Sequence, residues 1–288
     1  MSGLSRRHMQ AVHRLLRERL DRVPRSAVWE QIHRAFEIGE PRDRNLHFNA
    51  EQRRLLREQC RSAWGFDPLE GFPQGNRREV AAEAIDEKIA RERPDDRYVL
   101  VKGRLPEPLP PLASDLSLRV PVSGLNPDAI AQVVVIENLD SFDDWYAFRS
   151  PAELADALVL YRGHAGLARG TRNLLSILPE HIPVTVFPDW DPAGLLIALT
   201  LPRADALLAP TLTDALLAKG SPEHFAGQHR EARHLDNADL GGWQPVWDAM
   251  KAARISLKQQ HMLALGAALR RISLGDRSTT VQIRDDAE

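Results

Sequence analysis

Residues 184–194 read Val-Thr-Val-Phe-Pro-Asp-Trp-Asp-Pro-Ala-Gly. The first four residues predict a short strand that is buried on both faces. Pro192 suits the first turn of a helix, so a helix is expected over Pro192–Thr200. Asp189 and Asp191 lie between the strand and this helix, where two carboxylates can converge on one hard cation. The alternative is structural, because Asp-x-Asp-Pro also caps helices.

Short apolar runs of the same kind recur on both sides of this stretch. Further strands are expected at Gln132–Ile136, Ala157–Tyr161 and Ala206–Ala209. Helices are expected between and after the strands, at Ser150–Asp156, at Gly166–Ser176 and from Trp243 to about Arg271. Buried strands that alternate with helices predict an α/β fold with a parallel sheet flanked by helices.

A third acid follows another of these strands. Glu137-Asn138 comes directly after the strand at Gln132–Ile136. Ligands of parallel sheets gather at the carboxyl ends of the strands, so Glu137 and the aspartate pair are expected at one rim. Three adjacent carboxylates repel one another, and a bound Mg²⁺ or Mn²⁺ removes that repulsion. Taken alone, a glutamate after a strand is more often the start of a loop.

The N-terminal part has a different character. Residues 1–66 hold 14 Arg against eight acidic residues, and helices are expected at Leu4–Leu20, Ala27–Phe36 and Ala50–Trp64. Three short Arg-rich helices resemble a helix-turn-helix or winged-helix module that contacts DNA. A plain helical arm that packs on its neighbour is the alternative.

The linker between the two parts is expected in a proline-rich segment. A longer helix is expected from Asn76 towards Arg93, and four prolines then fall within Leu105–Leu112. Proline cannot join a helix or sheet interior, so we expect a boundary here. The predicted domains are a mainly helical basic arm over 1–123, which binds DNA or a partner, and a catalytic domain over 124–288.

Composition excludes several classes of protein. Cys60 is the single cysteine among 288 residues, which excludes an intramolecular disulfide and a Cys-based zinc site and fits a reducing cytoplasm. No 18 apolar residues run together, so no transmembrane helix and no membrane partner are expected. The N-terminus lacks the apolar stretch of a signal peptide. The expected location is the cytoplasm.

The C-terminal part resembles a Toprim domain, the fold shared by topoisomerases, primases and some nucleases. The resemblance rests on Glu137-Asn138, on Tyr161-Arg162-Gly163-His164-Ala165-Gly166 and on Asp189-x-Asp191-Pro192-Ala193-Gly194, each after a predicted strand. More narrowly, it is similar to the Toprim nuclease subunits of SMC/condensin-like plasmid-defence systems of the MksBEF/Wadjet type. The resemblance covers roughly residues 126–265.

This resemblance implies a metal-dependent DNA endonuclease that acts with an SMC/condensin-like complex in defence against plasmids. Glu137, Asp189 and Asp191 would be catalytic and would bind Mg²⁺ or Mn²⁺, with a proton-transfer role for Glu137 as the alternative. A homodimer is left open. The residues expected to contact the DNA substrate are Arg162, Gly163, His164, Arg169 and Gln260.

Two departures from the family's pattern keep other functions open. Related nucleases carry a late Leu-Glu-Gln-Glu-like segment whose acid approaches the metals, whereas the comparable stretch here is Leu257-Lys258-Gln259-Gln260-His261, without a carboxylate. The chain has three tyrosines, Tyr98, Tyr146 and Tyr161, none of them among the Arg-rich helices of residues 1–66, which favours hydrolysis over a topoisomerase mechanism. A non-catalytic DNA-binding adaptor and a topoisomerase-related strand-cleaving enzyme are the alternatives.

Overall fold

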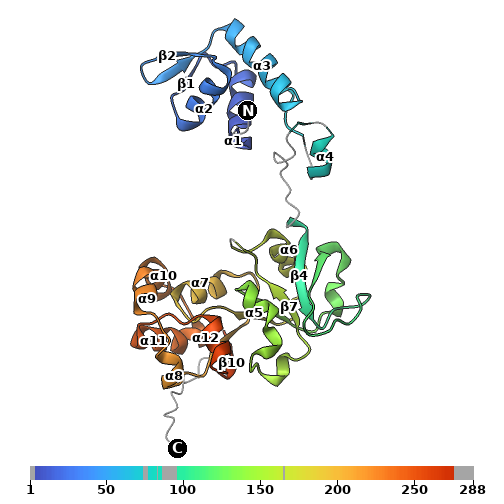
Figure 1. Cartoon of the computed structure of the whole chain (residues 1–288), viewed down its shortest axis with the longest axis vertical. Helices are drawn as coiled ribbons and strands as arrows, with labels where there is room; N and C mark the ends of the chain where they lie inside the picture. Colours follow the sequence, from blue (N-terminus) through green and yellow to red (C-terminus); the bar gives the residue numbers. More distant parts are fainter. Residues whose placement is uncertain (1–3, 74–76, 83, 86–95, 165, 276–288) are drawn as a thin grey trace, which may run out of the picture. The chain divides into compact units, whose positions relative to one another are not determined.

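The computed structural model describes residues 4–73, 77–82, 84–85, 96–164 and 166–275, which belong to two compact units, residues 1–94 and 95–288 (Figure 1). This division differs from the expected boundary at 123/124. Residues between 98 and 121 supply two strands to the sheet of the second unit, and the proline-rich segment Leu105–Leu112 connects these strands. The prolines therefore form a loop inside a domain.

The first unit contains helices and a small antiparallel sheet, coloured blue to cyan in Figure 1. Two expected helices, Ala27–Phe36 and Ala50–Trp64, are confirmed residue for residue. Three short strands were not expected, and the winged-helix assignment stays a prediction. Most of the helix predicted over 76–93 lies outside the described residues. The elements are α1 (Arg6–Arg17), β1 (Arg22–Pro24), α2 (Ala27–Phe36), β2 (Glu40–Arg42), β3 (Asn45–His47), α3 (Ala50–Trp64) and α4 (Arg77–Ala81).

The second unit is built on a seven-stranded mixed sheet, in the order β10-β9-β8-β6-β7-β4-β5. The four inner strands β9, β8, β6 and β7 run parallel, while β10, β4 and β5 are antiparallel to their neighbours. The expectation of a parallel sheet was therefore wrong for the outer strands. The strands are β4 (Tyr98–Gly103), β5 (Leu118–Pro121), β6 (Val133–Ile136), β7 (Leu158–Tyr161), β8 (Val184–Phe187), β9 (Ala206–Pro210) and β10 (Leu269–Ser273).

The order in which the chain adds parallel strands to the sheet reverses between β6 and β8. From β6 the chain crosses to β7 on one side, then returns to β8 on the other side of β6 and continues to β9. Every residue of β6 and β8 is buried, because both strands are covered on both faces. Such a switch point leaves a crevice at the carboxyl ends of the two strands, where ligands of α/β proteins bind.

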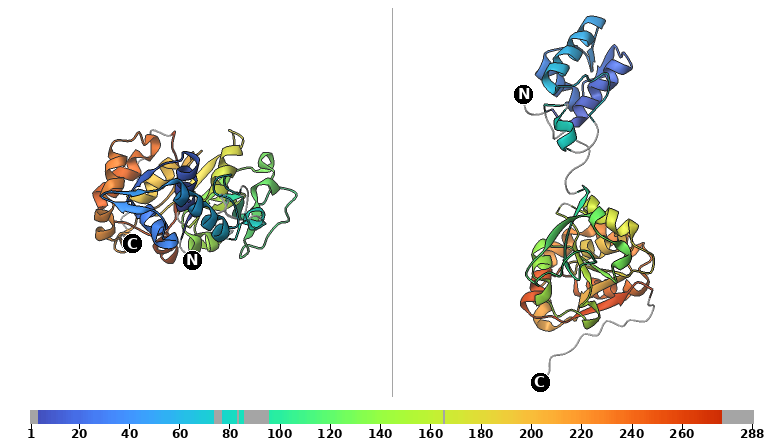
Figure 2. Two further views of the ribbon diagram at one scale, coloured as in Figure 1. Left: turned by 90° about the horizontal axis from the view of Figure 1, so that it is seen from above. Right: turned by 90° about the vertical axis from the view of Figure 1, so that its right-hand side faces the viewer.

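Helices flank this sheet in the second unit, shown from two further directions in Figure 2. The helix expected at Ser150–Asp156 is only a 3₁₀ turn. The long helix expected over 243–271 was also wrong, because Arg254 adopts a left-handed backbone (φ 54°) that ends α11, and the chain later forms β10. The helices are α5 (Leu139–Asp143), α6 (Arg169–Ile177), α7 (Pro192–Thr200), α8 (Asp214–Leu217), α9 (Pro222–Gly227), α10 (His229–Asp236), α11 (Gln244–Ala253) and α12 (Gln259–Ala264).

Short 3₁₀ turns occur at Val122–Gly124, Pro127–Ala129, Trp145–Ala147, Ala152–Leu154 and Gly241–Trp243. Among the described residues, no helix has both the length and the apolar character needed to cross a membrane.

Candidate functional site

Glu137 and Asp189 meet at the switch point of the sheet. Ile136, the last residue of β6, pairs with Phe187, the last residue of β8, so the residues that follow leave the sheet side by side. The backbone amide of Asp189 donates a 3.1 Å hydrogen bond to Oε2 of Glu137. Oε1 of Glu137 lies 3.7 Å from a guanidinium nitrogen of Arg162, which follows β7. The expected convergence of the first acid with the aspartate motif is confirmed.

Asp191 turns from this rim into the start of α7. Its Oδ1 accepts a 2.8 Å hydrogen bond from the amide of Gly194, which makes Asp191 the N-cap of the helix. Its Oδ2 accepts a 3.0 Å hydrogen bond from Nε2 of Gln228, and Oε1 of Gln228 accepts one from the amide of Ala193. Asp191 therefore has the capping role considered as the alternative, and one of its oxygens is still directed to other groups.

A distant segment places a lysine between the two aspartates. Trp190 and Leu257 form an antiparallel bridge through reciprocal backbone hydrogen bonds of 2.9 and 3.1 Å. The bridge brings Lys258 beside the motif, and its Nζ lies 2.9 Å from Oδ2 of Asp189 and 3.1 Å from Oδ2 of Asp191. One ammonium group thus neutralises much of the charge of the pair.

Asn138 and Gln259 hold the other oxygen of Asp189. Its Oδ1 accepts hydrogen bonds from Nδ2 of Asn138 (3.1 Å) and from the amide of Gln259 (2.9 Å). The Gln259 side chain is fully buried; it donates to the carbonyl of Phe187 and accepts from the amide of Asn138. These bonds tie the segment before α12 to the ends of both β6 and β8.

Burial shifts the ionisation of this cluster. Burial raises the pKa of Glu137, and the nearby charge of Asp189 raises it further, against the opposing effect of Arg162. Burial also raises the pKa of Asp189, although Lys258 opposes the shift. For Lys258, burial favours the neutral amine, but the two aspartates outweigh it and the pKa of the ammonium is raised. Perturbed groups of this kind at a sheet rim are typical of functional sites.

The donor set suits a hard divalent cation. Asp189 Oδ2 and Asp191 Oδ2 already share one positive group, and carboxylate oxygens are the ligands that Mg²⁺ and Mn²⁺ prefer. Glu137 lies next to the pair but uses Oε2 to hold the amide of Asp189. Within the described ranges, no three His, Cys, Asp or Glu side chains are grouped so that they could hold a metal ion together.

The predicted substrate-contacting residues lie at different distances from this cluster. Arg162 is part of it, and its Nε is buried without a hydrogen-bond partner in the described part of the chain. Gly163 follows with φ 125°, and a Cβ there would lie 2.7 Å from the carbonyl oxygen of Gly166, so the turn requires glycine. His164 is exposed in the same turn.

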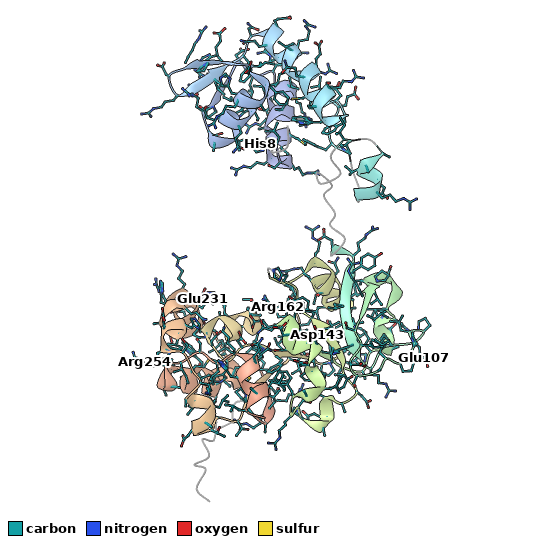
Figure 3. All side chains as sticks on the ribbon, viewed as in Figure 1. His8, Glu107, Asp143, Arg162, Glu231 and Arg254 are labelled. Carbon is teal, nitrogen blue, oxygen red and sulfur yellow. The ribbon has the colours of Figure 1, made fainter. Side chains whose placement is uncertain are left out.

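In the described part of the chain, Arg169 and Gln260 form no hydrogen bond or ion pair with Glu137, Asp189 or Asp191. Arg169, at the start of α6, donates a 3.1 Å hydrogen bond to Asp96. Gln260 is exposed on α12, and its neighbour Gln259 is the glutamine that reaches the site. Figure 3 shows Arg162 near the middle of the second unit, with Glu231 and Glu107 towards opposite ends.

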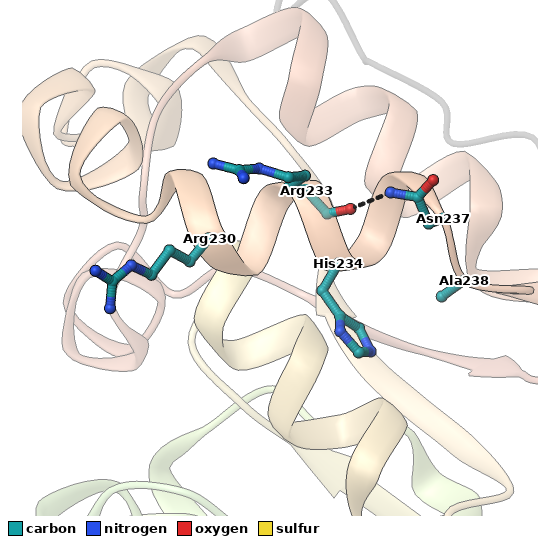
Figure 4. Close-up of a pocket in the computed structure, with 5 residues that line it drawn as sticks. All are labelled: Arg230, Arg233, His234, Asn237 and Ala238. Carbon is teal, nitrogen blue, oxygen red and sulfur yellow. Dashed lines mark hydrogen bonds between the residues drawn. The ribbon is translucent and has the colours of Figure 1, made fainter.

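A basic hollow lies along α10, close to Asp191. It has a volume of about 350 Å³ and is lined by Arg230, Arg233, His234, Asn237 and Ala238 (Figure 4). Both arginine side chains extend to the left in this view, towards the start of the helix, and neither forms an ion pair with any described residue. Gln228, which contacts Asp191, immediately precedes α10, so the arginines extend from the rim of the acid cluster.

Sequence reasoning did not assign Lys258, Gln259 or Gln228 to the site. Lys258 and Gln259 lie in the stretch that lacks the family's acid, and no periodicity marks them as site residues. The tyrosines offer no obvious nucleophile at the cluster: Tyr161 packs against Phe142, and Tyr98 stacks under Arg119.

A family model, "Domain of unknown function (DUF7281)", matches residues 92–271, the range that contains the whole acid cluster and the α10 hollow. No curated protein matches the chain.

Proposed function

The chain belongs to the DUF7281 family, and from its site we propose that it is a divalent-metal-dependent DNA endonuclease with a Toprim-like catalytic unit. The observation that carries this proposal is the convergence of Glu137 with the Asp189-x-Asp191 motif at the switch point between β6 and β8. Two buried carboxylates with a half-buried third beside them at a strand-end crevice are costly to the fold, and such groups are typical of functional sites.

The four parallel strands β9-β8-β6-β7 support the Toprim-like assignment. The three motifs that resemble Toprim follow β6, β7 and β8, so all three lie at the same end of the parallel core. The antiparallel strands lie outside this core and leave its carboxyl edge unchanged.

Asp189 and Asp191 would hold a Mg²⁺ or Mn²⁺ ion through their Oδ2 atoms, with Glu137 beside them. Such an ion supplies stabilisation of negative charge on the scissile phosphate and on the leaving oxygen. Gly194 and Gln228 orient Asp191, while Asn138 and Gln259 orient Asp189, so the oxygens are positioned before any ligand arrives.

Arg162 and Glu137 suit two further tasks. Arg162 would offer its guanidinium group to a phosphate oxygen, beside the Gly163 turn whose backbone can approach DNA closely. The raised pKa of Glu137 makes its carboxyl a candidate for proton exchange with the attacking water or the leaving oxygen. Ligation of the cation is the other role open to Glu137.

Arg230 and Arg233 would contact phosphates of the DNA backbone beyond the phosphate that is cleaved. They are three residues apart on α10, hence on one face and about 4.5 Å apart along the helix axis. Both are exposed cations without ion-pair partners among the described residues, as electrostatic contact with phosphates requires.

The basic arm offers fewer free charges than its composition suggests. Arg14, Arg25, Arg42, Arg53, Arg54 and Arg57 all form ion pairs with carboxylates of the first unit. This favours a partner-binding role for the arm at least as much as a DNA-binding one. Action with an SMC/condensin-like complex against plasmids remains part of the proposal, and it rests on the resemblance alone.

The contacts of Lys258 favour a second candidate, a non-catalytic DNA-binding adaptor. The Lys258 ammonium pairs with both Asp189 and Asp191, so their charges are compensated without a metal ion. This is what two aspartates with a purely structural role would require. An adaptor predicts DNA binding that is indifferent to Glu137, Asp189 and Asp191.

Plasmid cleavage separates the two candidates. The full chain, alone and with its SMC-type partners, is incubated with supercoiled plasmid in Mn²⁺, Mg²⁺ or EDTA. Asp191→Asn is the informative variant, because asparagine keeps the cap of α7 and removes the charge, whereas alanine would also lose the cap. The nuclease predicts metal-dependent cutting that Asp191→Asn abolishes. Folded protein that binds DNA and never cuts it, in any metal and with its partners, favours the adaptor.

A further inference from the structure

We propose that Lys258 is the resident cation of the Asp189–Asp191 pair and that a divalent ion binds this pair by displacing its ammonium group. The inference rests on the proposed function in one respect, namely that the pair receives a divalent cation. It adds a device that regulates occupancy of the site, in which the chain's own cation competes with the metal.

The position of Nζ is the first argument. It contacts one oxygen of each aspartate, Oδ2 in both, at 2.9 and 3.1 Å. The aspartate side chains are 8% and 2% exposed, so little water is in contact with their charges. A single positive group shared by two buried carboxylates lies where a bridging metal ion would lie.

The second argument concerns the remaining contacts of the two carboxylates. Oδ1 of Asp189 is held by Asn138 and by the amide of Gln259. Asp191 is held at Oδ1 by the amide of Gly194 and at Oδ2 by Nε2 of Gln228. All of these donors are uncharged. The carboxylates therefore stay oriented if Lys258 leaves, and their Oδ2 atoms stay directed towards the vacated position.

The third argument is that, among the described residues, only the two aspartates hold the side chain of Lys258. It precedes α12 as the N-cap residue with an extended backbone, and its side chain makes no capping hydrogen bond. The side chain is 37% exposed, so rotation of its flexible stem carries the ammonium into solvent. The hydrogen bonds that its carbonyl accepts from His261 and Met262 are independent of this rotation.

Displacement has a thermodynamic consequence. Metal binding must replace the interaction of the ammonium with both aspartates, so the apparent affinity for the ion is lower than that of the same oxygens without the lysine. Removal of the ammonium leaves two unpaired buried charges, which destabilises the protein until a cation returns. Tighter metal binding and lower stability without metal should therefore appear together.

Mn²⁺ binding to the full chain tests this inference by titration calorimetry or by the EPR signal of free Mn²⁺. Lys258→Met removes the charge and keeps the length of the side chain, and we expect it to bind Mn²⁺ at least about tenfold more tightly than wild type. Lys258→Arg retains a cation and is expected to bind as weakly as wild type. Lys251→Met is the matched control, because Lys251 also bridges two aspartates, Asp236 and Asp248, on the surface; its Mn²⁺ affinity should be unchanged.

Thermal unfolding gives a second readout that keeps the test decisive. In EDTA, Lys258→Met should melt below wild type, and saturating Mn²⁺ should raise its melting temperature more than that of wild type. Mn²⁺ affinity of Lys258→Met equal to or below that of wild type would overturn the inference. Because neither readout involves cleavage, tighter Mn²⁺ binding without cutting by any variant would contradict the nuclease and leave the displacement intact. Cutting by wild type, with no gain in Mn²⁺ affinity in Lys258→Met, would support the nuclease and contradict the displacement.

Discussion

The amide of Asp189 donates a hydrogen bond to Oε2 of Glu137 although 52 residues separate them in the chain. This contact exists because β6 and β8 are adjacent and in register, with Ile136 opposite Phe187. It makes the side chain of one acid a support for the backbone of the other. A substitution of Glu137 is therefore expected to alter the backbone position of the aspartate motif.

Glu137→Gln should abolish cleavage and stabilise the fold at neutral pH. An acid whose pKa is raised on folding binds more protons folded than unfolded, so its ionisation costs stability as the pH rises above its ordinary value of 4.5. Glutamine removes this cost and keeps an oxygen for the amide of Asp189. Melting temperatures between pH 4.5 and 8 should show an advantage of the variant that grows with pH. Glu153→Gln, at an exposed glutamate, should show none.

Gly194→Ala should distort the aspartate motif. A Cβ at this position would lie 2.2 Å from the carbonyl oxygen of Asp189, which is backbone and cannot turn aside. We expect a loss of about 2–3 kcal/mol in unfolding free energy and a loss of activity. Gly227→Ala, where a Cβ meets nothing within 4 Å, should stay within about 0.5 kcal/mol of wild type in denaturant titrations. Equal stability of the two variants would contradict the close packing of α7 on the motif.

Arg230→Ala/Arg233→Ala should weaken DNA binding and leave Mn²⁺ binding unchanged. Loss of two phosphate contacts lowers affinity, and the slope of log K against log salt should become shallower by about 2. Fluorescence anisotropy with duplex DNA at several salt concentrations measures both effects. Lys219→Ala removes an exposed cation elsewhere on this unit and serves as the control. An unchanged salt slope in the double variant would exclude α10 from the DNA path.

The thiol of Cys60 should report the opening of the first unit. Cys60 is fully buried on α3, and burial raises its pKa, so little reactive thiolate exists in the folded state. We expect reaction with a disulfide reagent to be at least about 100-fold slower in buffer than in denaturant. As the single cysteine, it gives a signal free of contributions from the second unit. Rapid reaction under native conditions would show that the core around α3 opens readily.

Local patterns predicted the inner elements well. The helix at Pro192–Thr200 and the strand at Val184–Phe187 have the expected bounds, because a proline start and a continuous apolar run leave few alternatives. The outer strands β5 and β10 escaped prediction, whereas a strand at Tyr98–Val101, within β4, was expected. β10 is short and contains two arginines, Arg270 and Arg271, so its own sequence does not indicate a buried strand. It forms by pairing with the free edge of β9.

By itself, the sequence determined which segments are buried strands, which acids follow them, and hence that Glu137 and the aspartate motif share the carboxyl edge of one sheet. Strand order and the cation beside the aspartates were decided only by the tertiary structure. The bridge between Trp190 and Leu257 brings Lys258 to residues 69 and 67 positions away. Contacts between residues so far apart in the chain depend on how whole elements pack, and the local spacing of residues does not predict that packing.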